Sequence, residues 1–184
     1  MSLRYTSLIA SLAIACAGVS AQAKEAPVKP HRADVDSLVR YVVPDQWDVE
    51  KDTAASDPYV RLSKGRHLLI VRLFGSKGSR FASPKDYVDS PAARATGQPP
   101  EVVDAAVVAG IKTTIYRTAY PINLGDPHVE GAKTELADEL FCVVPLKGRF
   151  LVLSYAYESA IPDPDLDGTA VWREFLSGFK LRKK

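Results

Sequence analysis

A run of acidic side chains near the C-terminus has the spacing of oxygen ligands for a metal ion. Hard cations such as Ca²⁺ prefer about six to eight oxygen ligands, and carboxylates at alternate positions of a tight loop can converge on one ion. Gly168 would permit the sharp turn that such a loop needs. The side chains and one carbonyl that could bind the ion are those of Asp163, Asp165, Asp167, Thr169 and Glu174.

Residues 163–174 resemble an EF-hand calcium loop, and this resemblance implies one weak, structural Ca²⁺ site. The segment before the loop alternates like a strand, however, where an EF-hand carries a helix. The alternative interpretation involves no metal. In it, Asp167 or Thr169 caps the following helix, and Asp163 and Asp165 stabilise the positive end of that helix.

Nucleophilic chemistry has one candidate thiol downstream of the N-terminal segment. Cys142 lies within an apolar run, which favours a small buried side chain over a reactive thiolate. His31, His67 and His128 are far apart in the sequence and have no metal-ligand spacing. His67 or His128 could act as a base for Cys142 only if the fold brings them together. The chain contains no GxSxG, HExxH, P-loop or CxxC motif, so the sequence assigns no catalytic group.

Two further groups of residues could bind a ligand. Segment 75–80 is rich in glycine, serine and basic residues, and Lys77 or Arg80 could hold a phosphate or an acidic lipid headgroup. A solvated loop is the alternative for this segment. Aromatic side chains could line an apolar cleft, or they could form ordinary core pairs. They are Trp47, Tyr116, Tyr120, Tyr155 and Tyr157.

Residues 1–23 have the order of a secretory signal peptide. Arg4 precedes a short apolar run, and a small-x-small triplet ends at Ala23, before Lys24. No later segment approaches the roughly 20 apolar residues of a membrane span. We therefore expect export and a periplasmic or secreted protein. A loose lipoprotein box around Cys16 gives the alternative of a lipid anchor, which mass spectrometry of the mature N-terminus would reveal.

Composition restricts the class of protein. The 24 basic and 22 acidic side chains give a net charge of +2, which argues against a nucleic-acid partner. A hydrophobic content of 46% is too high for a disordered chain, and 2 cysteines exclude a disulfide-rich scaffold. A length of 184 residues suits one domain. We expect a flexible leader over 24–35 and a single domain over 36–182.

Most of the expected domain consists of short strands with tight turns between them. The expected strands cover 38–44, 47–51, 58–63, 67–74, 102–109, 111–120, 136–145 and 148–158. A loop is expected over 121–133, and a short helix should begin at Ser83-Pro84. The last strand is apolar on both faces, so it should be covered on both sides.

An amphipathic helix over 169–179 completes the pattern, and its apolar stripe must dock on the sheet. These elements predict an α+β domain, with an antiparallel sheet of about six to eight strands flanked by helices.

Three segments follow one another in a recognisable order. They are an early strand that ends in a Pro-x-x-Trp turn (41–47), a late hairpin (141–155) and a terminal helix (172–181). This order resembles the PsbP-like α/β/α sandwich family. The resemblance implies an exported accessory or binding protein without chemistry of its own, and it assigns no site residue.

Two functions from different classes fit these observations. The first is an exported non-enzymatic binding or accessory protein of the cell envelope, with a protein or small-molecule partner and with or without one calcium site. The second is an exported hydrolase or thiol enzyme whose carboxylate pair or Cys–His pair is assembled by the fold. A pocket with convergent titratable groups would favour the enzyme, and a smooth apolar or charged face would favour binding.

Overall fold

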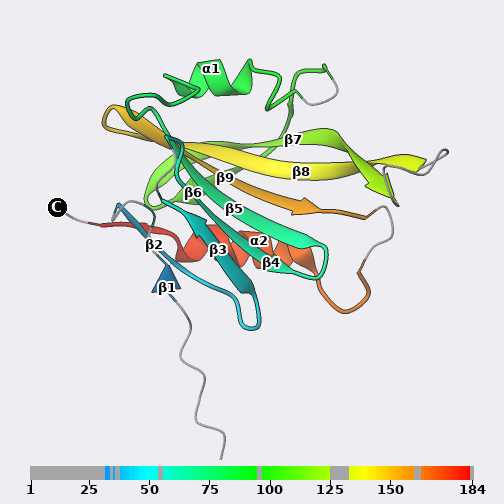
Figure 1. The fold of residues 1–184 in the computed structure, drawn as a ribbon. Coiled ribbons are helices and arrows are strands. Elements are labelled where there is room, and N and C mark those ends of the chain that lie inside the picture. The colour runs from blue at the N-terminus through cyan, green and yellow to red at the C-terminus, as the bar shows by residue number, and fades with distance from the viewer. Residues whose placement is uncertain are drawn as a thin grey trace, which may run out of the picture.

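A computed structural model describes most of the expected domain. The described residues are 32–33, 35, 38–53, 56–94, 97–124, 133–159 and 163–182. They form a seven-stranded sheet, a three-stranded sheet and two helices (Figure 1). Within these residues, no helix combines the length and apolar character that crossing a bilayer requires. The expected signal peptide 1–23, Cys16, His31 and His128 lie outside the described residues.

The seven-stranded sheet is antiparallel and has the order β3-β4-β5-β9-β8-β7-β6. Its strands are β3 (Asp48–Asp52), β4 (Tyr59–Lys64), β5 (His67–Phe74), β6 (Glu101–Val108), β7 (Ile111–Leu124), β8 (Lys133–Leu146) and β9 (Arg149–Tyr157). Gly148 adopts a φ of 71° in the β8–β9 turn, a conformation that favours glycine. The α+β class and the size of the sheet confirm the prediction.

Strand β9 occupies the centre of the large sheet and is buried on both faces. Leu151, Leu153 and Tyr155 belong to the core on one face, and Phe150 and Val152 belong to a second cluster on the other. The period of two along the strand puts neighbouring side chains on opposite faces. The predicted coverage of this strand on both sides is therefore confirmed.

The two helices cover opposite faces of the large sheet (Figure 1). Helix α1 (Pro84–Val88) begins as predicted, because the Ser83 side chain accepts a hydrogen bond of 3.2 Å from the Asp86 N–H. Helix α2 (Gly168–Gly178) docks through the predicted apolar stripe. Its buried apolar side chains are Trp172, Phe175 and Leu176.

A small sheet lies beside α2, on the same side of the large sheet (Figure 1). Its central strand β2 (Val39–Val42) pairs with β1 (Arg32–Ala33) and β10 (Lys180–Leu181). Val35 is completely buried in the core. Both β1 and Val35 fall within the flexible leader expected over 24–35, so part of that segment belongs to the folded domain. The boundary expected at residue 36 lies too late, because β1 pairs with β2 and Val35 packs in the core.

The prediction of a loop over 121–133 is wrong at both of its ends, where the structure has strands. Strand β7 continues to Leu124 and β8 begins at Lys133, with Pro121 opposite Leu136 in the ladder. Strand β6 pairs with β7 only as far as Arg117. Beyond that point β7 is an edge among the described strands, and the missing N–H of a proline is tolerated at an edge.

Candidate functional site

His67 joins the large sheet to the loop that precedes α2. Its side chain is buried, with Nε2 3.0 Å from Asp163 Oδ2 and Nδ1 2.9 Å from the Tyr155 hydroxyl. Because a carboxylate only accepts, Nε2 donates the hydrogen bond to Asp163, and Nδ1 shares a hydrogen bond with the Tyr155 hydroxyl. We refer to His67, Tyr155 and Asp163 as the His67 network. It fixes the loop to the sheet.

Hydrogen bonds lower the pKa of Asp163 in the His67 network, whereas burial raises the pKa of Tyr155. The Asp165 N–H, 2.8 Å from Asp163 Oδ1, is the largest of the causes that lower the pKa of the Asp163 carboxyl, and His67 adds to it. Burial raises the pKa of Tyr155 to about 12, so its hydroxyl keeps its proton at neutral pH. The buried, protonated Tyr155 hydroxyl thus serves as a hydrogen-bonding group within the protein rather than as an accessible nucleophile.

Asp167 caps α2, as one of the two interpretations of the acidic loop predicts. Its side chain accepts a hydrogen bond of 3.0 Å from the Ala170 N–H. Thr169 and Glu174 are exposed on α2. Among the residues that the structure describes, no three His, Cys, Asp or Glu side chains are grouped so that they could hold a metal ion. Calcium binding by the loop stays a prediction, and in the structure Asp163 accepts hydrogen bonds from His67 and from the Asp165 N–H.

Two substitutions distinguish the calcium-binding interpretation of the acidic loop from the helix-capping one. We expect Asp167→Ala to lower the free energy of unfolding by about 1 kcal/mol through loss of the cap. The exposed Asp165→Ala should change it by less than about 0.5 kcal/mol without calcium. If the loop binds Ca²⁺, saturation at about 100 times the Kd should add roughly 2.7 kcal/mol, which Asp165→Ala should reduce. Calorimetry without heat or a melting shift would leave the cap alone.

Cys142 is not placed for nucleophilic chemistry. It is fully buried on β8, and burial raises the pKa of its thiol to about 12. Both ring nitrogens of His67 are already engaged by Tyr155 and Asp163. The thiol-enzyme hypothesis therefore gains no Cys–His pair from the described part of the chain.

Segment 75–80 binds a carboxylate of the chain itself. Asp57 is 7% exposed and accepts hydrogen bonds from Ser79 Oγ at 2.6 Å and Arg80 Nε at 2.8 Å. Burial by itself would raise the pKa of Asp57, but these hydrogen bonds and the Arg80 charge outweigh it and lower the pKa. Arg80, a cation that the sequence offered for a phosphate, is thus already paired inside the protein.

The lowered pKa of Asp57 has a measurable consequence at acid pH. Ionised Asp57 stabilises the fold above the ordinary aspartate pKa of about 4, and this stabilisation is lost as the pH falls through the lower, folded pKa. We expect the Tm of the protein to fall with pH below about 4, and to fall less steeply in Asp57→Asn. Calorimetry across this range is the measurement, and identical slopes for the two proteins would contradict the role of Asp57.

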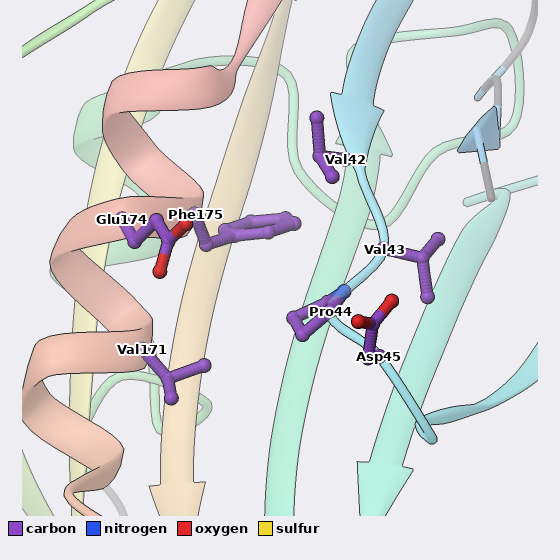
Figure 2. Close-up of a pocket in the computed structure, with 7 residues that line it drawn as sticks. All are labelled: Val42, Val43, Pro44, Asp45, Val171, Glu174 and Phe175. Carbon is purple, nitrogen blue, oxygen red and sulfur yellow. The ribbon is translucent and has the colours of Figure 1, made fainter. Parts of the chain in front are cut away.

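An open groove lies between α2 and the segment that includes the end of β2 (Figure 2). Its volume is about 390 Å³. Figure 2 shows Val171 and Phe175 pointing from the helix toward Val42 and Pro44 on the opposite wall. The complete lining is Val42, Val43, Pro44, Asp45, Val171, Glu174 and Phe175. The groove is therefore mainly apolar, with one exposed carboxylate on each wall.

The apolar side chains of the groove follow from the way α2 and β2 pack. Phe175 is 3% exposed, with its ring centroid 5.4 Å from that of Tyr41 and 6.2 Å from that of Trp172. Alternation along β2 turns Tyr41 and Val43 into the core and leaves Val42 on the outside. Val42 is 43% exposed and forms part of the wall.

Asp45, the acidic residue on the β2 wall of the groove, lies in a turn with an uncommon backbone conformation. The Trp47 N–H donates to the Pro44 carbonyl at 3.4 Å, and Gln46 between them has a φ of 63°. A left-handed conformation is uncommon outside glycine, and surrounding contacts must hold it. Lys64 Nζ donates to the Gln46 side chain at 3.2 Å. Asp45 is thereby held at the exposed side of the groove.

A second pocket, of about 470 Å³, lies between α1 and strands β7 and β8. Tyr116, one of the aromatic residues considered for a ligand cleft, lines it and stacks on Phe141 with a centroid distance of 5.1 Å. Lys85 and Asp89 also line this pocket, but they pair with each other, and Arg94 pairs with the same carboxylate. Two of the charged side chains that line this pocket are therefore already paired within the protein.

Trp47 and Tyr155 belong to the main core, so the alternative of ordinary core packing holds for these two aromatic residues. Tyr157 packs partly buried against the same core, and its ring stacks on His67 with a centroid distance of 4.4 Å. Neither the groove beside α2 nor the pocket beside α1 is lined by these three residues. The sequence alone gave no signal for the groove, because its walls meet only in the fold.

The comparisons with known proteins concern the fold. No protein-family model and no curated protein matches the chain. Among solved structures, it is similar to a mutant of protein Mog1, with 12% identity, a TM-score of 0.49, and coverage of 83% of this chain and 96% of that one. It is also similar to PsbP of Synechocystis sp. PCC 6803, with 15% identity, a TM-score of 0.48 and coverage of 89% and 99%.

A third similar structure is LpqN of Mycobacterium tuberculosis, described as involved in cell envelope biogenesis. The identity is 13% and the TM-score 0.39, over 87% of this chain and 88% of that one. The similar structures thus include a PsbP, the family that the order of elements in the sequence resembles. These likenesses assign no residue and no partner to this chain.

Proposed function

We propose that this chain is an exported, non-enzymatic accessory or binding protein of the cell envelope. In this proposal, its partner binds in the groove between α2 and residues 42–45. The groove is the observation that carries the proposal, because it combines an open apolar lining with exposed carboxylates on both walls. Concave apolar sites with a few polar groups are where proteins bind ligands and partner segments.

A hydrolase is the second candidate, and the presence of Asp45 and Glu174 in one groove favours it. Acid–base catalysis by two carboxyl groups needs one of them desolvated, so that it keeps its proton near neutral pH. Asp45 and Glu174 are both exposed. The pair therefore suits charge recognition better than proton transfer. Hydrolysis that Asp45→Asn and Glu174→Gln both abolish would reverse this preference.

Export is proposed from the order of residues 1–23, with soluble export preferred to a lipid anchor. Under this proposal, the mature protein is periplasmic or secreted. Its N-terminus would be a free Lys24 after soluble export, or an acylated Cys16 in a lipoprotein. Mass spectrometry of the protein isolated from its own cells distinguishes these two forms.

The groove is tested by two substitutions at equally exposed valines. Val42 lines the groove, whereas Val49 on β3 lines neither the groove nor the pocket beside α1, and each side chain is 43% exposed. We expect Val42→Arg to fill the groove and to abolish capture of the partner from the cell envelope. Val49→Arg should capture it like the unaltered protein. Equal capture by all three proteins, compared after cross-linking, would contradict a partner in the groove.

A further inference from the structure

Charges of opposite sign lie on either side of Val42 in the groove. Besides the main groove, Val42 lines a smaller pocket of about 220 Å³, at the end of α2 next to β10. Arg40 and Lys180 line the smaller pocket, while the carboxylates of Asp45 and Glu174 line the main one. A molecule that spans Val42 therefore meets cations on one side and carboxylates on the other.

The two cations are in an unfavourable arrangement unless an anion joins them. Arg40 and Lys180 are directly opposite each other in the pairing of β2 with β10, and both side chains are exposed. Like charges at such positions repel across a sheet. Within the described residues, neither side chain has an ion pair or a hydrogen bond with an acidic group. A carboxylate placed between them would relieve this repulsion.

The two carboxylates of the main pocket likewise have no ionic partner among the described residues. The side chains of Asp45 and Glu174 make no ion pair with any described residue. Val171, Phe175 and Pro44 provide apolar surface beside them. Along the groove, the environment therefore changes from cationic, across Val42, to an apolar surface that carries two carboxylates.

We propose that the groove binds a peptide segment of a partner protein that carries acidic residues at one end, an apolar residue in the middle and Lys or Arg at the other end. The proposal rests on the function proposed above. An anionic membrane surface fits less well, because it would be attracted by Arg40 and Lys180 but repelled by Asp45 and Glu174. An extended segment places successive side chains in separate pockets, as the two pockets around Val42 require.

The experiment uses three capped synthetic peptides of equal length with one apolar centre. The first has glutamates at one end and lysines at the other, the second has glutamates at both ends, and the third has lysines at both ends. We expect the protein to bind the first about tenfold more tightly than either of the others in fluorescence anisotropy. The preference should shrink as NaCl is raised, because exposed charges are screened.

Charge reversal of the groove should reverse the choice of peptide. The double variant Arg40→Glu/Lys180→Glu should prefer the lysine peptide, and Asp45→Lys/Glu174→Lys should prefer the glutamate peptide. Lys51→Glu/Lys147→Glu is the matched control, because it changes the net charge like the first double variant, at exposed positions that line neither pocket. This control should keep the preference of the unaltered protein, and thermal melting should verify that all variants fold.

Three results would overturn the proposal. They are equal affinity for the three peptides, preferences that charge reversal leaves unchanged, and binding of phosphatidylglycerol vesicles without binding of the mixed peptide. The function proposed above fails separately, when Val42→Arg leaves capture of the partner intact. Capture that depends on Val42 but ignores all four charges would refute only the peptide proposal.

Discussion

Phe175→Ala is expected to lower the free energy of unfolding by about 3–5 kcal/mol. The side chain is 3% exposed, and its ring lies among those of Tyr41, Trp172 and Phe179 at centroid distances of 5.4, 6.2 and 6.0 Å. Truncation removes these contacts and leaves a cavity between α2 and the small sheet. The loss should be large because this ring belongs to the core that joins α2 to both sheets.

Denaturant unfolding of Phe175→Ala and Ser177→Ala measures this contribution. Ser177 is exposed on the same helix, and its hydroxyl donates to the Glu174 carbonyl, so its substitution should change stability by less than about 0.5 kcal/mol. A loss below about 1 kcal/mol for Phe175→Ala would mean that α2 is not docked through this ring.

Local patterns were sufficient to predict most of the strands and the starts of both helices. The apolar run 67–74 coincides with β5, and Ser83 and Asp167 cap the helices that the sequence placed after them. Alternation, tight-turn residues and caps act over a few residues, so they can be recognised without knowledge of the fold. The same patterns predicted the α+β class and the antiparallel sheet.

Elements that depend on distant partners were missed. Strands β1 and β10 are only 2 residues long, which is too short for a periodic pattern, and they exist because β2 lies between them. The walls of the groove are equally non-local, since residues 42–45 and 171–175 meet only after α2 docks. Neither segment carries a sequence pattern that indicates contact with the other, so the candidate site could not be predicted from the sequence.

The acidic loop shows how one spacing can serve different purposes. Asp163, Asp165 and Asp167 alternate as calcium ligands would, but the spacing also suits a turn that enters a helix. In the structure Asp163 bonds to His67 and to the Asp165 N–H, while Asp167 caps α2. The partner of Asp163 is the first residue of a strand far away in the sequence, and only the fold could reveal it.

Gly168→Ala is expected to lower the free energy of unfolding by about 3 kcal/mol, through overpacking at the start of α2. A Cβ at Gly168 would overlap the Tyr155 hydroxyl and lie 2.9 Å from His67 Nδ1. Tyr155 cannot move aside freely, because His67 holds its hydroxyl at 2.9 Å and its ring stacks on Trp172. Either the first turn of α2 or the His67 network must shift.

Gly178, at the other end of the same helix, provides the matched control. Its nearest neighbour would be Val42 Cγ2 at 3.9 Å from the added Cβ, an ordinary contact, so Gly178→Ala should leave stability unchanged or raise it by less than about 1 kcal/mol. Adding Tyr155→Phe to Gly168→Ala should restore only part of the loss, because the ring carbon that bears the hydroxyl would still overlap the Cβ. If Gly168→Ala proved as stable as Gly178→Ala in denaturant unfolding, the first turn of α2 would not rest on Tyr155. The His67 network would then not position the helix that forms one wall of the groove.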